Sequence, residues 1–564
     1  MRKHFYLTMT VVSAMALTSC KKLGALSADN FTVTPTPLEA IAGQVPATIN
    51  GKFPEKYMKK KAVVTVTPVL KYEGGEVKGQ SATFQGEKVK GNNQTISYKV
   101  GGNYTMKSIF DFVPAMQKSD LYLTFDAKVG KKTVTVPEVK IGYGVLATSD
   151  LLKNTLATAN AATAADGFQR IIKQRQEANI KFLIQQANIR NSELKTTSIQ
   201  EFIQTLKDIN ADQKGKALTD IEISAYASPD GALDLNTRLA EDRQNNSEKY
   251  VAKTLKTNKM EADVKTKYTA EDWDGFQELV SASNIQDKDV ILRVLSMYKD
   301  PEEREAQIKN MSAVFQELAE TILPELRRAR LAINYELIGR SDDEIKAQFA
   351  SDASKLSNEE LLYGATLVNT PAEKEAWYQK ATQLYANDYR AYNNLAQLAY
   401  AKGDLTSAES HLNKAKSLKA DASEVNTNLA LIALAKNDIA TAESYLAKGS
   451  GANSFKEVMG NLQIAKGNYQ QAAGNLNGVN TNSAALAQIL NKDYAAAKNT
   501  LNNVKNADAY TAYLKAIVAA RTNDASGVSS NLRTAIQKDS SLAKRAAIDL
   551  EFANFASSIE SLVK

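Results

Sequence analysis

Cysteine and histidine, which supply thiol nucleophiles, imidazole bases and soft metal ligands, are scarce in this chain of 564 residues. It contains one cysteine, Cys20, and two histidines, His4 and His411. A zinc site of the usual type needs several Cys or His ligands, and nucleophilic catalysis by Ser or Cys needs an imidazole beside the nucleophile. No nucleophile-base pair, metal cluster or phosphate-binding loop can be recognised. The sequence therefore predicts a protein that is not an enzyme and that uses no metal and no cofactor.

Cys20 ends a segment with the composition of an export signal. Arg2 and Lys3 precede an apolar stretch from Leu7 to Leu17, and Leu17-Thr18-Ser19 stand directly before the cysteine. The stretch is shorter than the roughly 20 apolar residues that cross a bilayer, so it is typical of a cleaved signal. It resembles the signal peptide and lipobox of bacterial lipoproteins. The resemblance implies removal of residues 1–19, lipidation (including palmitate) of Cys20, and a tether over residues 20–29.

The predicted location follows from this anchor. No acidic run follows Cys20, because Lys21-Lys22-Leu23-Gly24 comes next, and some lineages use such a run to send lipoproteins to the cell surface. We therefore expect an outer-membrane protein that faces the periplasm, with the cell surface as the alternative. The formal net charge of +7, from 70 basic and 63 acidic residues, is mild, and export argues against nucleic acid as a partner.

The central region combines a turn with a helix that carries charged groups. Ile221 to Tyr226 has the composition of a strand, Ala227 to Gly231 that of a turn, and the segment containing Leu239 and Leu255 that of a helix. The run Asn236-Thr237-Arg238-Leu239-Ala240-Glu241-Asp242-Arg243 resembles the Asn-x-x-Leu-Ser-x-x-Arg motif of the OmpA and Pal family. Arg327 to Arg330, before a predicted final strand, is a further partial match.

The resemblance implies an α/β domain that binds peptidoglycan through a turn carboxylate and the helix arginine. A carboxylate and a guanidinium are the groups that hold the ammonium and the carboxylate of diaminopimelate. The candidate residues are Arg243, Asp230, Ser228 and Asn236, but Ser228 stands where the family has its Asp. Alternatively, Arg243 is a surface arginine beside Glu241 and Asp242, and wall binding has been lost.

The remaining segments give a multidomain fold class. Alternating residues and glycine turns predict an immunoglobulin-like β-sandwich over residues 30–145. Residues 146–340 are interpreted as a helical lead-in, which extends to about Ile180, followed by the OmpA-like domain with a helical insertion between Ala270 and Pro324. Residues 341–371 are expected to form a helical linker.

A repeat begins near Ala372. Leu395, Gly403, Asp404 and Ala408 recur 34 residues later as Leu429, Asn437, Asp438 and Ala442, which is the tetratricopeptide period. Residues 372–564 are therefore predicted to form an α-solenoid that resembles tetratricopeptide repeats, with a protein partner on its concave face.

Two functions of different kinds fit these segments. One is a scaffold lipoprotein that tethers the outer membrane to peptidoglycan, binds a protein partner, or does both. The other is an accessory subunit of an envelope assembly or secretion complex, in which only protein contacts remain. An enzyme is the third and weakest hypothesis.

Overall fold

The computed structural model describes residues 23–285 and 287–563 and divides the chain into two compact units. The first unit combines residues 1–166 with residues 368–564, and the second contains residues 167–367. Cys20 and the predicted signal peptide lie outside the described residues. Cleavage of the signal and lipidation of Cys20 therefore stay predictions. No helix among the described residues has the length and apolar composition needed to cross a membrane.

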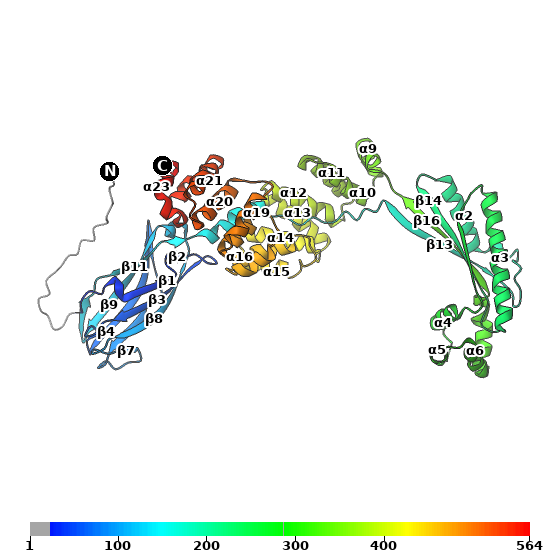
Figure 1. The fold of residues 1–564 in the computed structure, drawn as a ribbon, viewed down its shortest axis with the longest axis horizontal. Helices are drawn as coiled ribbons and strands as arrows, with labels where there is room; N and C mark the ends of the chain where they lie inside the picture. The colour runs from blue at the N-terminus through cyan, green and yellow to red at the C-terminus, as the bar shows by residue number, and fades with distance from the viewer. Residues whose placement is uncertain (1–22, 286, 564) are drawn as a thin grey trace. The chain divides into compact units, whose positions relative to one another are not determined.

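The N-terminal region of the first unit contains two main sheets that share one apolar core and are antiparallel except for the pair β6–β7, together with a short parallel pair of β2 (Leu38–Glu39) and β12 (Val145–Leu146) (Figure 1). Alternating burial along β4 and β9, which pair over their full length, accounts for this arrangement, because successive side chains of a strand point to opposite faces. The smaller sheet has the order β1 (Phe31–Thr34), β3 (Gln44–Phe53), β8 (Gly102–Asp111). The larger sheet contains β4 (Ala62–Tyr72), β5 (Gly75–Lys78), β6 (Ala82–Gly86), β7 (Gln94–Ile96), β9 (Ser119–Val129), β10 (Lys132–Thr135) and β11 (Val139–Tyr143). The predicted sheet-rich region is therefore confirmed, and its immunoglobulin-like type stays a prediction.

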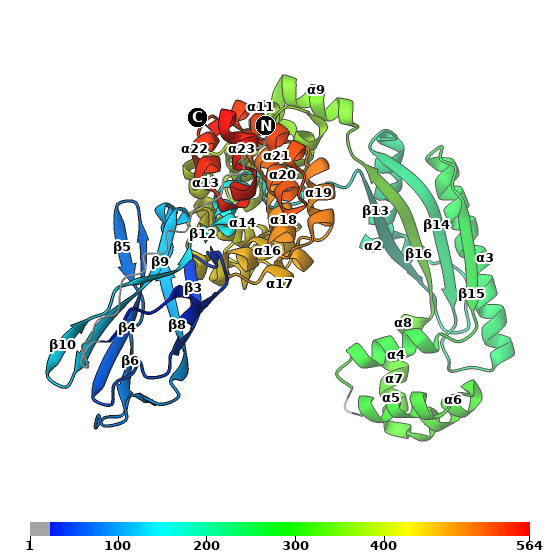
Figure 2. The same cartoon turned by 60° about the vertical axis from the view of Figure 1, so that its left-hand side comes forward.

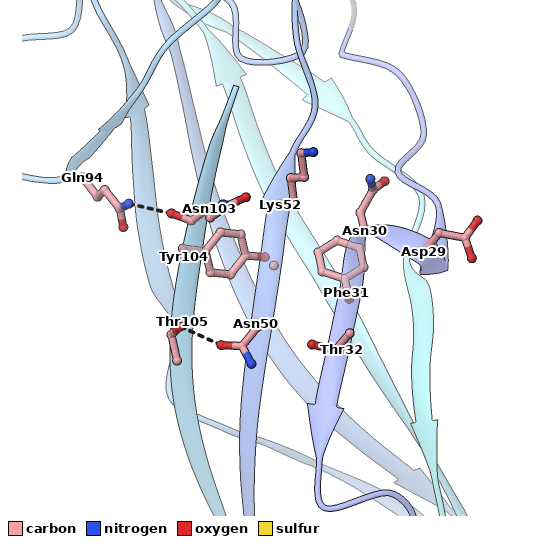
Figure 3. A pocket seen from close by; sticks show the side chains of 11 residues that line it. Asp29, Asn30, Phe31, Thr32, Asn50, Lys52, Gln94, Asn103, Tyr104 and Thr105 are labelled. Atoms are coloured by element: carbon pink, nitrogen blue, oxygen red, sulfur yellow. Dashed lines mark hydrogen bonds between the residues drawn. The ribbon is translucent and has the colours of Figure 1, made fainter. Parts of the chain in front are cut away.

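An open hollow of about 580 Å³ lies on the smaller sheet (Figure 3). Two of the polar groups along it are already bonded to neighbours. The Thr105 hydroxyl donates to the Asn50 amide oxygen at 2.7 Å, and the Gln94 amide donates to the Asn103 carbonyl at 3.0 Å. This hollow is therefore a wide, polar surface of the sheet.

The second unit is built on a four-stranded mixed sheet with the order β13-β16-β14-β15 (Figure 2). One face of this sheet packs against α2 and α3 in a single apolar core. The helices contribute Phe202, Leu206 and Val251 to that core. Five short helices between β15 and β16 form a separate core, at the place where the sequence predicts a helical insertion. The elements are β13 (Ile171–Lys181), α2 (Thr197–Ala211), β14 (Lys216–Tyr226), α3 (Leu233–Thr257), β15 (Val264–Thr269), α4 (Trp273–Ala282), α5 (Lys288–Met297), α6 (Pro301–Asn310), α7 (Ser312–Thr321), α8 (Leu323–Leu326), β16 (Arg328–Ile338), α9 (Asp342–Asp352) and α10 (Asn358–Gly364).

The predicted helical lead-in is wrong for most of its length. Only short helical turns occur, in η3 (Thr148–Leu151), α1 (Leu152–Thr155) and η4 (Leu156–Thr158). Residues 159–170 are not helical, and Ile171 to Lys181 is strand β13, which pairs with β16. Alanine-rich composition favours a helix only weakly, and here hydrogen bonds to distant parts of the chain replace those that a helix would make.

The C-terminal region is a series of antiparallel helix pairs, which confirms the predicted helical repeats. Several pairs meet at a residue with positive φ that ends the first helix, including Gly403 at +78°, Asn437 at +59° and Gly467 at +79°. Glycine and asparagine suit this conformation better than other residues. The helices are α11 (Pro371–Leu384), α12 (Tyr389–Ala401), α13 (Leu405–Leu418), α14 (Ser423–Ala435), α15 (Ile439–Leu446), α16 (Phe455–Ala465), α17 (Tyr469–Asn475), α18 (Asn482–Leu490), α19 (Tyr494–Asn502), α20 (Ala509–Arg521), α21 (Ala525–Lys538), α22 (Leu542–Ile548) and α23 (Ala556–Val563).

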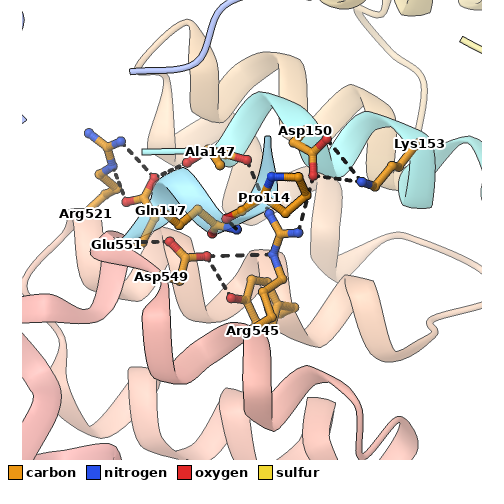
Figure 4. Close-up of polar contacts among 11 residues, drawn as sticks. Pro114, Gln117, Ala147, Asp150, Lys153, Arg521, Arg545, Asp549 and Glu551 are labelled. Atoms are coloured by element: carbon orange, nitrogen blue, oxygen red, sulfur yellow. Dashed lines mark hydrogen bonds and ion pairs between the residues drawn. The ribbon is translucent and has the colours of Figure 1, made fainter. Parts of the chain in front are cut away.

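A polar cluster joins the chain that leaves the sheets to the last repeats (Figure 4). Glu551, almost fully buried, accepts two hydrogen bonds from Arg521, at 2.7 and 2.8 Å, and one from the Thr148 hydroxyl. Arg545 donates to the Ala147 carbonyl at 3.2 Å. Through the Thr148 and Ala147 bonds, the cluster connects residues 147–148 to the end of the repeats.

Candidate functional site: an asparagine-lined groove

The inner surface of the repeats is lined by polar side chains at equivalent positions of successive first helices. Asn393, Glu457 and Asn482 each lie ten residues before the positive-φ residue that ends the helix, namely Gly403, Gly467 and Lys492. The following position holds Asn394 in α12, and Asn428 is its equivalent in α14, 34 residues later. All five side chains are at most 5% exposed.

The side chains of Asn393, Asn394, Asn428 and Glu457 hold residues 155–166 of the same chain, which we call the groove segment. Asn428 makes a two-point contact with Ala162: its amide oxygen accepts from the Ala162 N–H at 2.6 Å and its NH₂ donates to the Ala162 carbonyl at 2.8 Å. Asn394 holds Ala164 in the same way, at 2.8 and 3.1 Å. The contacts fall on every second residue, as expected when an extended chain presents alternate main-chain groups to one side.

The contacts continue on both sides of these alanines. The Glu457 carboxylate accepts from the main-chain N–H and the side-chain amide of Asn160, both at 2.9 Å. The Tyr400 hydroxyl donates to the Leu156 carbonyl at 2.7 Å, and Arg390 donates to the Asp166 carbonyl at 2.7 Å. The groove segment is therefore bound over its whole length.

The groove recognises the peptide main chain and small side chains. Most of the bonds go to main-chain N–H and C=O groups, which are the same in every sequence. Ala162 is fully buried and Ala164 is 2% exposed, so a larger side chain at either position would have to displace its surroundings. The arrangement binds an extended polypeptide and places no nucleophile beside a base.

Glu457 gives the groove a pH dependence. Burial raises the pKa of Glu457 above its usual 4.5, although the two bonds from Asn160 act in the opposite direction. A carboxyl group whose pKa is higher in the folded chain binds a proton more readily when folded, so folding stability rises as the pH falls toward 4.5. We expect the melting temperature of the wild type, minus that of Glu457→Gln, to increase as the pH is lowered from about 8 to about 5. A difference that does not change with pH would contradict a raised pKa.

The structure buries Arg243 and surrounds it with main-chain acceptors. Its side chain is 1% exposed and donates to the carbonyls of Gln186 at 3.0 Å, Tyr226 at 2.8 Å and Leu183 at 3.3 Å. The guanidinium also lies over the Phe182 ring, 5.2 Å from its centre. Burial lowers the pKa of Arg243 from 12.5 to about 10. Arg243 is therefore not the surface arginine of the alternative hypothesis, and its donors hold the loop after β13 against the end of β14.

The other predicted ligand residues lie together at the turn after β14, where their polar groups bond to the protein itself. Asp230 accepts from the Ser228 hydroxyl and from Arg327, whose Nη2 lies at 3.1 Å. Arg327 also donates to the Ser228 hydroxyl at 3.2 Å, and the Asn236 amide donates to the Gly231 carbonyl at 2.9 Å. The structure thus brings Ser228, Asp230 and Asn236 to one turn, with Arg327 as the charged partner of Asp230. Their binding of peptidoglycan stays a prediction.

No group of three or more His, Cys, Asp or Glu residues that could hold a metal ion occurs within residues 23–285 and 287–563. The groove residues were missed in the sequence, although one signal was present. Asn394-Leu395-Ala396 recurs as Asn428-Leu429-Ala430 at the repeat period, and a buried polar residue at a repeated position indicates a shared contact.

Comparison with solved structures finds helical-repeat proteins. The chain is similar to a tetratricopeptide repeat protein from Parabacteroides merdae, with 14% identity over 35% of this chain and 85% of that one and a TM-score of 0.27. It is also similar to Pseudomonas aeruginosa PilF, with 14% identity over 39% of this chain and 99% of that one and a TM-score of 0.27. For yeast Tom70 the identity is 11%, the coverage 66% and 91%, and the TM-score 0.23. No protein-family model and no curated protein matches the chain. The helical repeats are accordingly established by the helix pairs of this chain and by their 34-residue period.

Proposed function

We propose that the protein is a lipid-anchored scaffold of the bacterial cell envelope that organises other proteins through its helical repeats and is not an enzyme. The observation that carries the proposal is the groove in which Asn394 and Asn428 bind the main chain of an extended segment. A surface that recognises a main chain through paired amide bonds is suited to holding polypeptides. In the structure this surface holds the groove segment, which leads along the chain into the second unit.

The membrane part of the proposal rests on Cys20 and is tested by lipid labelling. We expect cells grown with radiolabelled palmitate to label the wild-type protein and to retain it in the membrane fraction. Cys20→Ala removes the acylated thiol, so both the label and the membrane retention should be lost. Ser19→Ala keeps a small residue before the cysteine and is the matched control, which should be labelled like the wild type. An unlabelled wild-type protein would refute the anchor.

Between the two scaffold readings, the contacts of the second unit support the accessory function without wall binding. The groups of Arg243, Asp230 and Asn236 that would reach peptidoglycan already bond to the protein. A ligand that bound Asp230 would have to separate it from Arg327, and the two side chains are only 16% and 12% exposed. The ligand would then have to compensate both nearly buried charges, which is costly.

The tether is the second candidate, and co-sedimentation with purified peptidoglycan sacculi decides between the two. The protein without its lipid should stay in the supernatant if the accessory function is correct. Sedimentation that is abolished by Asp230→Asn, but not by the exposed Arg238→Ala, would instead establish the tether.

The orientation of the protein is tested by protease treatment of intact cells. Digestion beyond residue 30 would indicate a surface location instead of a periplasmic one.

A further inference from the structure

One edge of the groove segment is free. The N–H and C=O groups of Ala162 and Ala164 and the N–H of Asn160 are bonded to side chains of the helices, as described above. The main-chain groups of Ala161 and Thr163 make no hydrogen bond within the part of the chain that the structure describes. In an extended chain these intervening residues direct their N–H and C=O groups to the opposite side. Such a free edge is a template for pairing with another strand.

A large open cavity lies along this edge. Its volume is about 1090 Å³, and Ala161 and Thr163 are part of its wall together with the starts of α16, α18 and α20. Sites for small molecules usually have volumes of about 300 to 1,000 Å³, so the cavity is large enough for several residues of a polypeptide. The Asn394 and Asn428 contacts are not part of its wall, whereas the Asn160–Glu457 contact is.

The lining of the cavity repeats the chemistry that binds the groove segment. Five of its asparagine side chains make no hydrogen bond to any residue in the described ranges: Asn453, Asn475, Asn477, Asn480 and Asn506. Asn394 and Asn428, in the same groove, show how such amides bond to the N–H and C=O groups of an extended chain. Free amides next to a free strand edge are therefore suited to a second extended chain.

The charges of the lining favour an acidic occupant. Lys456 and Lys505 are exposed and form no ion pair with any described residue. The lining also contains two acids, but Glu457 is buried and binds Asn160, and Asp508 is half-buried and accepts from Asn482 at 2.9 Å and from the Thr511 N–H at 2.8 Å. The exposed charges of the cavity are therefore those of the two lysines, and complementary charges across an interface favour the correct partner.

We infer that this cavity binds an extended, acidic segment of a protein partner, which pairs as a strand with the free edge of the groove segment at Ala161 and Thr163. The inference deepens the proposed scaffold function and rests on it. The partner surface is then a composite of the repeats and the groove segment, so a partner binds while the groove segment stays in place.

The test is fluorescence polarisation with the full chain and a labelled peptide of about ten residues in which Asp alternates with Ala or Thr. We expect saturable binding with a Kd below about 100 µM. Two matched peptides separate the contributions: one carries Lys in place of Asp, and the other carries N-methyl groups on its central residues, which removes strand pairing but keeps the charge. Both should bind at least about tenfold more weakly.

Variants of the protein test the same two features. Thr163→Pro removes the free-edge N–H and should weaken binding about tenfold or more, whereas Ala165→Pro makes the same change outside the cavity and should leave binding unchanged. The double variant Lys456→Glu, Lys505→Glu should also weaken binding of the acidic peptide. The control double variant Lys253→Glu, Lys256→Glu, on the exposed surface of α3, should leave that binding unchanged. Unchanged melting temperatures would show that the variants are folded.

The inference is overturned if the acidic peptide does not bind at 1 mM, or if the N-methylated peptide binds equally well. These outcomes leave the scaffold function untouched, because palmitate labelling and photo-crosslinking to a partner at positions outside the cavity would still support it. Failure of the labelling would refute the anchor but would not alter peptide binding.

Discussion

Arg243→Ala is expected to unfold the region around the end of β14. The change removes three hydrogen bonds to carbonyls and leaves a cavity where a side chain is 1% exposed. A buried acceptor without a partner costs about 1 to 3 kcal/mol, so the total loss is about 3 kcal/mol or more. This is a large part of the 5 to 15 kcal/mol by which domains are usually stable.

Hydrogen exchange of the full chain measures this effect locally. In Arg243→Ala, the amides of residues 183–190 and of the end of β14 should exchange at least about a hundredfold faster than in the wild type. Arg238→Ala is the matched control, because Arg238 is on the same helix and exposed, and it should exchange like the wild type. Wild-type protection in Arg243→Ala would show that the carbonyl contacts contribute little. Loss of sacculus binding in Arg243→Ala would not by itself identify a ligand residue, since the fold around it changes.

The second large effect is expected from Asn394→Ala combined with Asn428→Ala. The double variant removes both two-point contacts and leaves the Ala162 N–H and both main-chain groups of Ala164 without their partners, while the Ala162 carbonyl keeps the bond from Asn393 at 3.0 Å. Each buried group that loses its partner costs about 1 to 3 kcal/mol unless water replaces it. The groove segment should therefore detach locally while the helices, whose apolar core is unchanged, remain folded.

Hydrogen exchange and limited proteolysis measure this detachment. The amides of Asn160, Ala162 and Ala164 should exchange at least about a hundredfold faster, and proteases should cut within residues 157–166. Asn453→Ala with Asn475→Ala, whose side chains make no bonds within the described residues, is the control and should behave like the wild type. If the double variant stays protected, the main contribution must come from the remaining contacts of Asn393, Glu457, Tyr400 and Arg390.

The repeats could be predicted from the sequence because their determinants are local. Leu395, Asp404 and Ala408 recur at a fixed period, and each helix pair packs mainly against its neighbours, so the pattern that repeats in the sequence also repeats in space. The strands of the N-terminal region were predictable for a similar reason, since alternation along β9 reflects burial of one face.

The groove contacts were decided by the tertiary structure alone. Ala162 and Asn428 are 266 positions apart and Ala164 and Asn394 are 230 apart, so no local pattern connects them. Composition favours a helix between residues 146 and 180 because alanine has the highest intrinsic helix propensity. That preference, a few tenths of a kcal/mol per residue over most others, is smaller than the free energy of the amide contacts that hold the segment extended.

The same division applies to the predicted ligand residues. The sequence by itself places Arg243 on a helix and Ser228 and Asp230 in a turn after a strand, and the structure has these elements. Only the folded chain brings the carbonyls of Leu183 and Gln186 to the guanidinium and Arg327 to Asp230. Sequence determines which side chains can bond and on which face of an element they lie, whereas the partner that each one bonds is fixed when distant segments pack together.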